Sequence, residues 1–168
     1  SFDILHLMKG VVIGASLSGK TTVAKYLRSN TSIIVSEMDE ELTKLNNGKY
    51  PTDLEHKHES LAPKIIKDLL NKKNVLFFTN TDYFSLDDLR EAKDKGFKVI
   101  QLELSLSELN RRNRNRVKNE GYDDLCKWFE GMVVYQEKIR NAGAVDIIID
   151  ASQPVKKIAE EIQREFAK

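Results

Sequence analysis

Residues 14–21 read GASLSGKT, which fits the pattern G-x-x-x-x-G-K-[ST] of a phosphate-binding P-loop. Gly14 and Gly19 carry no Cβ, so the backbone can turn tightly and approach a phosphate closely. The loop amides then form an anion nest, and the following helix adds the positive end of its dipole. Lys20 can reach the β- and γ-phosphates of a nucleotide, and the Thr21 hydroxyl can bind Mg²⁺. The nucleotide-binding residues predicted in this stretch are Gly14, Ala15, Ser16, Leu17, Ser18, Gly19, Lys20, Thr21 and Thr22.

The residues around the loop supply the strand and the helix that the motif requires. Residues 9–13 form an apolar, β-branched run, typical of a strand buried on both faces of a parallel sheet. After the loop, Val23, Ala24 and Leu27 recur at helical spacing, and Asn30 is the expected end of that helix. A glycine-rich turn without a ligand is the alternative. The positions of Lys20 and Thr21 favour the nucleotide site.

Strand-like runs alternate with helical patterns along the whole chain. The runs cover residues 10–13, 32–35, 74–79, 98–104 and 146–149. This alternation predicts a three-layer α/β fold in which helices flank a five-stranded parallel sheet. No linker divides the chain, so we expect one domain over residues 1–168. Within it, residues 40–73 are predicted to be a helical insertion on the substrate side, and residues 111–125 a small lid. Met8 is a candidate natural start, which would make residues 1–7 an added leader.

The composition limits the classes of protein that fit. The chain has 168 residues, is 40% hydrophobic and 32% charged, and has a formal net charge of +1. Such values are typical of a globular domain and give no general attraction to nucleic acid or membranes. Cys126 is the single cysteine, which excludes an intramolecular disulfide and a thiol-rich metal site. No apolar run is long enough to span a bilayer, and we expect a cytoplasmic protein.

Several helix boundaries are marked by capping sequences. Ser85 begins a Ser-Leu-Asp-Asp capping box, Ser105 begins Ser-Leu-Ser-Glu, and Thr52 begins Thr-Asp-Leu-Glu. Pro63 should kink or restart the helix that follows Thr52. Pro154 is expected at the start of the last helix.

Two carboxylates follow the second strand-like run. Asp39 and Glu37 are expected near the γ-phosphate, because ligands of open α/β sheets bind at the carboxyl ends of the strands. Asp39 could accept a proton from an attacking hydroxyl or hold a Mg²⁺-bound water. The alternative role for Asp39 is a helix N-cap. The two roles are compatible, and both residues are predicted to contact the substrate.

The segment after the third strand-like run contains further candidates. Asp82 could be a second Mg²⁺-organising carboxylate, although an ordinary turn residue fits the spacing equally well. Thr79 or Asn80 could line the substrate pocket. In the insertion, Tyr50 and Lys49 are candidate substrate contacts.

A run of cationic residues follows the fourth strand. Arg111, Arg112, Arg114 and Arg116 crowd a predicted helix, and Arg112 and Arg116 are four residues apart, on one face. Guanidinium groups suit the charge that develops on a transferred phosphoryl group, so Arg112 and Arg116 are candidate catalytic residues. A solvated basic face is the alternative. The run also resembles a small nucleic-acid patch, but no aromatic residues interleave it.

Taken together, these motifs resemble the P-loop small-molecule kinases, which include the nucleoside monophosphate, shikimate and gluconate kinases. The resemblance covers residues 10–166 and rests on GASLSGKT, Asp39, the tract LSLSELNRRNRNR and the tract DIIIDASQP at 146–154. It implies the P-loop NTPase fold, ATP and Mg²⁺. Arg112 and Arg116 would match lid arginines, and Gln153 and Pro154 would lie in the loop that borders the adenine.

The chain also departs from these kinases. It lacks an adenylate-kinase signature for a nucleotide acceptor, and its third strand lacks the triple glycine of shikimate kinases. The sequence therefore predicts transfer of the γ-phosphoryl of Mg-ATP to a small acceptor such as a nucleoside, nucleotide or sugar-like metabolite, by a monomer or homodimer. Lys20, Asp39, Arg112 and Arg116 would be catalytic, and Thr21, Asp39 and Asp82 would bind the metal. A regulatory nucleotide-binding NTPase and a polynucleotide end kinase are the alternatives.

Overall fold

A computed structural model describes residues 7–168, so all of the expected leader except residue 7 lies outside the described part. The strands are β1 (Lys9–Gly14), β2 (Val35–Glu37), β3 (Val75–Asn80), β4 (Lys98–Glu103) and β5 (Ile147–Asp150). The helices are α1 (Lys20–Asn30), α2 (Met38–Leu45), α3 (Ala62–Leu70), α4 (Leu86–Asp94), α5 (Leu106–Glu120), α6 (Cys126–Asn141) and α7 (Val155–Phe166). A π-helix spans His56–Leu61 and a 3₁₀ turn spans Thr81–Tyr83.

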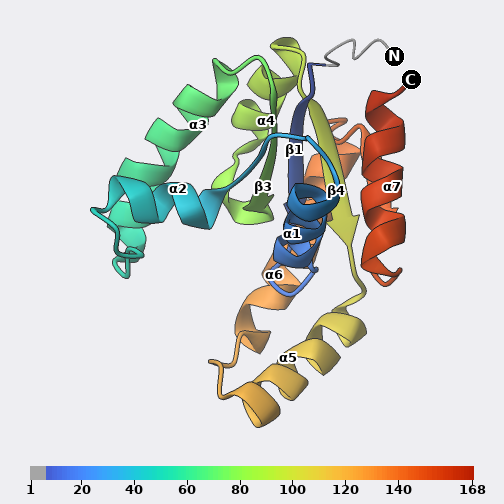
Figure 1. Ribbon diagram of the computed structural model, residues 1–168. Coiled ribbons are helices and arrows are strands. Elements are labelled where there is room, and N and C mark those ends of the chain that lie inside the picture. The colour runs from blue at the N-terminus through green and yellow to red at the C-terminus, as the bar shows by residue number, and fades with distance from the viewer. Residues whose placement is uncertain (1–6) are drawn as a thin grey trace.

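The strands form one sheet in the order β2-β3-β1-β4-β5, and every pair is parallel. Helices α1 and α7 lie on one side of the sheet, and α3 and α4 lie on the other (Figure 1). The predicted five-stranded parallel sheet flanked by helices is therefore confirmed. Because all strands run the same way, their carboxyl ends meet at one edge, where Gly14 pairs with Asn80 on one side and Leu102 on the other.

The core is split into two halves by the alternation of β1. Val11 and Ile13 point into one hydrophobic cluster with α3 and α4, and Val12 points into the other with α1 and α7. All three side chains are fully buried, and each contributes about 1.5–3 kcal/mol of burial free energy. The continuous apolar run of β1 is thus explained by burial on both faces.

Gly10 allows the last helix to close on the first strand. A Cβ at Gly10 would lie 2.5 Å from Cζ of Phe166 and 2.8 Å from Cδ1 of Leu76. A side chain at position 10 would therefore force the Phe166 ring and the end of the Leu76 side chain to shift. The first strand and the end of the last helix are therefore in direct contact.

The second strand does not begin where the sequence predicts. The expected run at 32–35 is mostly an extended connection, and β2 covers Val35–Glu37 instead. Ile34 is 55% exposed, because β2 is an edge strand that makes only a short pairing with β3. The shift brings Glu37 and then Asp39 directly to the edge where the P-loop lies.

The helix caps are partly as predicted. Ser85 forms the complete capping box with Asp88. Ser105 accepts a hydrogen bond from the amide of Glu108, but the carboxylate of Glu108 turns to Arg111 and Arg112, so only half of that box forms.

Further along the chain, α1 ends at Asn30 and α7 begins directly after Pro154, both as predicted. The cap near residue 52 is supplied by Asp53, whose carboxylate accepts the amide of His56, and not by Thr52. The chain then forms the π-helix and restarts as α3 with Pro63 in its first turn, as expected for a proline that restarts a helix. Among the described residues, no helix is long and apolar enough to cross a membrane.

Candidate active site

The P-loop joins β1 to α1 at the centre of the sheet edge. A Cβ at Gly14 would lie 2.5 Å from Oγ of Ser18 and 3.3 Å from the Leu102 carbonyl oxygen, so the close approach of the loop requires glycine. Gly19 has φ +90° and Leu17 has φ +69°, so both residues adopt the left-handed backbone conformation. This conformation favours glycine, which explains the glycine at position 19. Helix α1 begins at Lys20 with no side-chain cap and no acidic residue in its first turn. This uncapped helix end fits a phosphate.

The amine of Lys20 lies inside the loop, although its side chain as a whole is only half-buried. It donates hydrogen bonds to the carbonyl oxygens of Gly14 and Ala15, both at 2.8 Å, and to Oγ of Ser18 at 3.3 Å. Burial lowers the pKa of Lys20 to about 7, and the negative charges of Asp39, Asp82 and Glu37 oppose that shift. A bound triphosphate would add the anionic partner that favours the charged amine.

The two carboxylates after β2 have different surroundings. Glu37 forms a 2.9 Å ion pair with Arg28, which also bonds Glu40 at 2.8 Å, and burial raises the pKa of Glu37. Asp39 is exposed, and its Oδ1 accepts a 3.4 Å hydrogen bond from the hydroxyl of Tyr50. The N-cap of α2 is Glu37, so the alternative of Asp39 as a helix cap is wrong. Since Asp39 lies inside the first turn, its carboxylate is free to face the P-loop.

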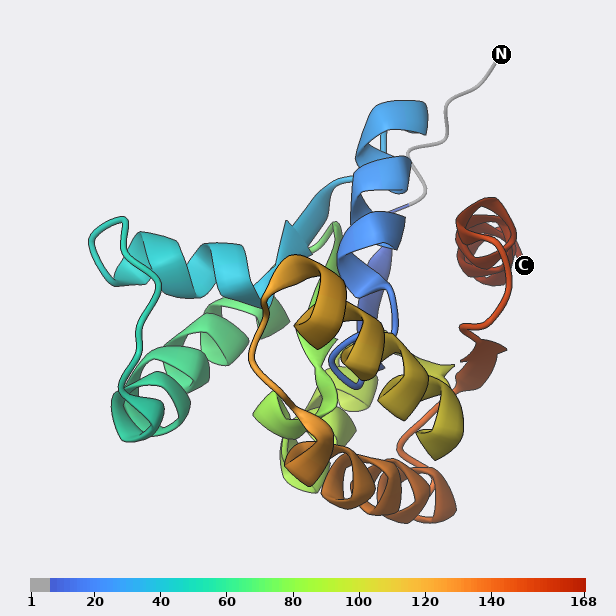
Figure 2. The same cartoon turned by 90° about the horizontal axis from the view of Figure 1, so that it is seen from below.

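Helix α5 crosses beside the P-loop and carries the arginines to it (Figure 2). The guanidinium of Arg112 donates to the carbonyl oxygen of Leu17 at 2.9 Å and to that of Ala151, in the β5–α7 loop, at 3.4 Å. Its Nε lies 3.1 Å from Glu108. One side chain thus links the loop that would hold phosphates to the loop that would border a base.

Arg116 lies one turn further along α5. Its guanidinium carbon is 3.9 Å from the ring centroid of Tyr122, and its Nε is 3.8 Å from Glu120. The neighbouring Arg111 is exposed and pairs with Glu108 at 2.6 Å. Arg112 and Arg116 face the P-loop, whereas Arg111 faces away, as the helical spacing predicts.

These groups surround a cavity of about 670 Å³ at the mouth of the P-loop. The predicted site residues that line it are Ser16, Leu17, Gly19, Lys20, Thr21, Thr22, Glu37, Asp39, Thr79, Asn80, Arg112 and Arg116. Gly14, Ala15 and Ser18 form the loop beneath it, and Gln153 and Pro154 follow Ala151 in the β5–α7 loop. Met38, Phe78, Asn115, Glu120 and Leu125 also line the cavity and were not predicted. Helical spacing from Arg112 and Arg116 could have indicated Asn115 and Glu120.

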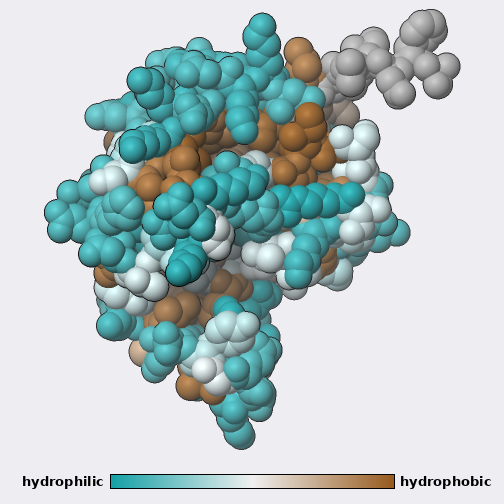
Figure 3. Space-filling model, turned by 60° about the vertical axis from the view of Figure 1, so that its left-hand side comes forward, coloured by the Kyte–Doolittle hydropathy of each residue, from teal (hydrophilic) through white to brown (hydrophobic). Residues whose placement is uncertain are grey.

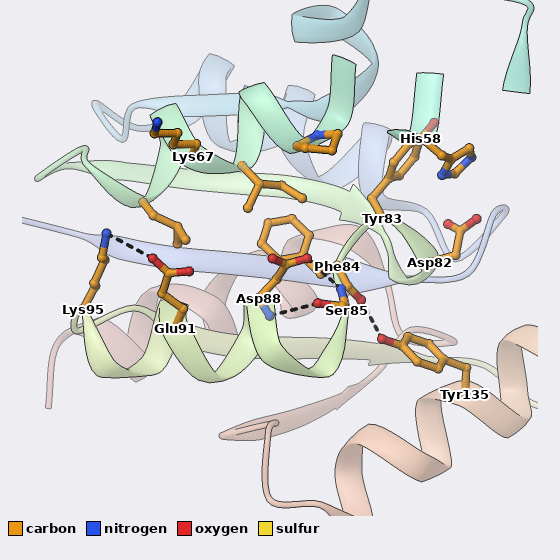
Figure 4. Close-up of a pocket in the computed structure, with 13 residues that line it drawn as sticks. His58, Lys67, Asp82, Tyr83, Phe84, Ser85, Asp88, Glu91, Lys95 and Tyr135 are labelled. Carbon is orange, nitrogen blue, oxygen red and sulfur yellow. Dashed lines mark hydrogen bonds and ion pairs between the residues drawn. The ribbon is translucent and has the colours of Figure 1, made fainter. Parts of the chain in front are cut away.

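Asp82 lies in the 3₁₀ turn after β3 and lines a different cavity, of about 790 Å³. That cavity runs between α3 and α4 (Figure 4), and Figure 3 shows apolar atoms gathered in a hollow on this side of the molecule. Its apolar lining includes Pro63, Ile66 and Phe84. The negative charge of Asp82 still raises the pKa of Lys20, so Asp82 is close enough to influence the P-loop electrostatically. Its role as a metal ligand stays a prediction.

Tyr50 and Tyr83 meet beside Asp39. Burial raises the pKa of Tyr83, and a hydrogen bond with Tyr50 adds to this shift. The Tyr83 ring also stacks on His58, with centroids 4.6 Å apart (Figure 4). The sequence contained no signal for Tyr83, because its position depends on how the insertion folds.

The donor groups suit a magnesium ion that arrives with phosphates. Within residues 7–168, no group of three or more His, Cys, Asp or Glu side chains is arranged to hold a metal alone. Mg²⁺ in phosphate-transferring sites is held by one or two carboxylates together with phosphate oxygens and waters. The Thr21 hydroxyl and the Asp39 carboxylate, which line the same cavity, fit such a partial set.

No known family model matches this sequence. Over 163 residues the chain is 26% identical to a shikimate kinase from Aquifex aeolicus, covering 92% of this chain and 94% of the relative. The crystal structure of the Aquifex aeolicus enzyme superposes with a TM-score of 0.73, at 24% identity over 95% of this chain and 96% of that one. The chain is therefore similar to the small-molecule P-loop kinases in sequence and in fold.

Two further solved structures share the fold of this chain. A shikimate kinase from Acinetobacter baumannii in complex with shikimate has a TM-score of 0.73 at 13% identity, over 97% of this chain and 95% of that one. A gluconokinase from Sinorhizobium meliloti has a TM-score of 0.64 at 22% identity, over 96% of this chain and 93% of that one. The printed names of these proteins differ, one being a shikimate kinase and the other a gluconokinase, so the similarity points to no single acceptor.

Proposed function

We propose that the protein transfers the γ-phosphoryl group of Mg-ATP to a hydroxyl or phosphate group of a small acceptor. The observation that carries this proposal is the separation of charge in the 670 Å³ cavity. Lys20, Arg112 and Arg116 line its P-loop side, and Glu37 and Asp39 line the side formed by the end of β2. Cations and an uncapped helix end suit the donor phosphates, and a carboxylate suits an acceptor hydroxyl.

The donor end would bind the triphosphate through the P-loop amides and Lys20. Thr21, with Asp39 and Asp82 as candidate carboxylates, would hold Mg²⁺, which supplies charge neutralisation to the β- and γ-oxygens when bound. Arg112 and Arg116 would contact the equatorial oxygens of the transferred group. Gln153 and Pro154 would border the adenine from the β5–α7 loop.

The acceptor end would activate the nucleophile. The acceptor oxygen attacks the γ-phosphorus, the bond to the β–γ bridging oxygen breaks, and ADP leaves with that oxygen. Asp39 takes the proton of an acceptor hydroxyl. Glu37, Tyr50 and Asn80 would position the acceptor. Residues 111–125 would act as the lid over the donor, and residues 40–73 as the wall on the acceptor side.

A phosphotransfer screen tests this proposal. Purified protein with Mg-ATP is incubated with nucleosides, nucleotides, sugars and short oligonucleotides, and both ADP and the phosphorylated product are measured. At least one small acceptor should raise ADP formation, and Lys20→Ala should abolish it. Full activity of Lys20→Ala contradicts the proposal. Hydrolysis that no acceptor accelerates would favour a regulatory NTPase, and salt-sensitive binding and phosphorylation of an oligonucleotide would favour an end kinase. A cytoplasmic location and a monomeric or homodimeric state remain predictions.

A further inference from the structure

The acceptor end of the cavity contains no arginine. The cations that line the cavity are Lys20, Arg112 and Arg116, all on the P-loop side. Every arginine of the chain lies within the described residues, and the others are placed elsewhere. Three of them are paired with carboxylates: Arg28 with Glu37 and Glu40, Arg90 with Asp87 at 3.6 Å, and Arg140 with Glu103 at 2.8 Å. Arg111 and Arg114 are on the exposed face of α5, and Arg164 is on α7.

The groups present at this end suit hydroxyls. Asp39 can accept a hydrogen bond, and the side-chain amide of half-buried Asn80 can both donate and accept. The hydroxyl of Tyr50 lies 3.4 Å from Oδ1 of Asp39, beside the phenol of Tyr83. Because burial raises the pKa of Tyr83, that phenol stays protonated and can donate as well as accept.

Among the lysines and arginines of residues 7–168, Lys57 is the one that contacts this group, through Tyr50. Its amine lies 3.4 Å from the Tyr50 hydroxyl and 5.3 Å from the centroid of the Tyr50 ring. The ammonium is therefore directed to the phenol, and it does not line the cavity. The exposed carboxylate of Asp39 supplies an opposing negative charge at this end of the cavity.

A negatively charged acceptor would be poorly bound here. A carboxylate or phosphate group is usually held by bidentate guanidinium contacts, and none is available at this end. It would also lie close to the negative charge of Asp39, and that repulsion is strongest in a partly desolvated site. A hydroxyl group has neither problem, because it can donate to the carboxylate and accept from a phenol.

We propose that the acceptor is an uncharged polyhydroxy compound, bound through Asp39, Tyr50 and Asn80. This inference rests on the proposed phosphotransfer and narrows its acceptor class. It predicts that the kinase discriminates against acceptors that carry a carboxylate or a phosphate. Lys57 is then a positioning residue for Tyr50 and does not bind an acceptor anion.

The test compares polyhydroxy acceptors of similar size and different charge. The set pairs D-glucose with D-gluconate and with glucose 6-phosphate, and pairs myo-inositol with inositol monophosphate and shikimate. ADP formation and the phosphorylated product are measured for each. At least one uncharged member should raise ADP formation tenfold or more above the rate with ATP alone. The rate with its charged counterpart should be at least tenfold lower than the rate with that uncharged member. Preference for an anionic member overturns the inference, as does a lack of response from every uncharged member.

A Lys57→Gln variant separates the two roles of that amine. If Lys57 only positions Tyr50, the variant shifts the ratio of kcat/KM between uncharged and anionic acceptors by less than twofold. If Lys57 binds an acceptor anion, the variant loses activity tenfold or more with anionic acceptors alone, which overturns the inference. Circular dichroism and thermal unfolding confirm that the variant is folded.

A Lys20→Ala control separates this inference from the proposed function. ADP formation that depends on Lys20 and prefers an anionic acceptor overturns the acceptor class and leaves the phosphotransfer intact. ADP formation that is independent of Lys20 overturns both.

Discussion

Replacement of Arg112 by alanine should damage catalysis and stability together, and the same change at Arg111 should affect neither. Arg112 bonds the carbonyl oxygens of Leu17 and Ala151, in two loops that are far apart in the sequence. Arg111 is the adjacent residue on the same helix, but its guanidinium reaches only Glu108. The two variants remove the same side chain from the same helix. They differ in whether that side chain touches the P-loop.

The expected magnitudes follow from these contacts. Hydrogen bonds to charged groups contribute about 1.5–3 kcal/mol each, but the Arg112 side chain is 27% exposed and the bond to Ala151 is long, at 3.4 Å. We therefore expect a loss of about 2 kcal/mol in the free energy of unfolding. For a chain of this size that lowers Tm by about 4–8 °C. Loss of one preorganised donor to the transition state costs about 10²–10³ in kcat.

The assay is a coupled measurement of ADP formation with the acceptor found in the screen, at a temperature well below the Tm of both variants. Unfolding in urea and by heat gives the stability. Arg112→Ala should lower kcat about 100-fold or more, and Arg111→Ala should stay within twofold. The reasoning is refuted if Arg112→Ala keeps kcat within threefold, or if Arg111→Ala is as defective.

Three further predictions concern the same site. Gly14→Ala should cost about 1–3 kcal/mol of unfolding free energy, because its Cβ would meet Oγ of Ser18 at 2.5 Å, and the double variant with Ser18→Ala should recover part of that loss in urea unfolding. Because the pKa of Lys20 is about 7 in the protein alone, the amine is mostly neutral above that pH. A bound triphosphate raises the pKa of Lys20, so nucleotide binding at pH 8 should be accompanied by uptake of a proton. Calorimetry in buffers of different ionisation enthalpy measures this uptake, and a binding enthalpy independent of buffer would contradict it. Asn113→Ala should cost about 1–3 kcal/mol, because buried Asn113 accepts the amide of Leu125 at 3.0 Å, and unchanged urea unfolding would count against that anchor.

The sequence predicted the sheet because burial on both faces leaves a clear pattern. Val11, Val12 and Ile13 are apolar in succession, and the structure buries all three. The second strand was misplaced because its pattern is different. Ile34 is apolar but exposed, whereas Ser36 and Glu37 are polar and lie in the strand. An edge strand of three residues is held by its pairing with β3, which no local pattern encodes.

The candidate site also has parts that local sequence patterns predict and parts that they do not. The P-loop and the arginines could be located because each depends on short spacings, such as the four residues between Arg112 and Arg116. The contacts of Tyr50 with Lys57 and Tyr83 could not, because they depend on the fold of the insertion. The sequence left Asp82 open as a Mg²⁺-organising carboxylate or a turn residue, and the structure has it in the 3₁₀ turn after β3, on the neighbouring cavity.

The contact between Gly10 and Phe166 has a consequence for how the protein folds during synthesis. The strand that starts the sheet is covered on that face by the helix that ends at Phe166. A ribosome must therefore synthesise residue 166 before this contact can form, and the part of the hydrophobic cluster that α7 covers stays incomplete until then. Pairings between residues so far apart in sequence also close slowly. The interval before residue 166 emerges is thus when the chain is most prone to aggregate or to need a chaperone.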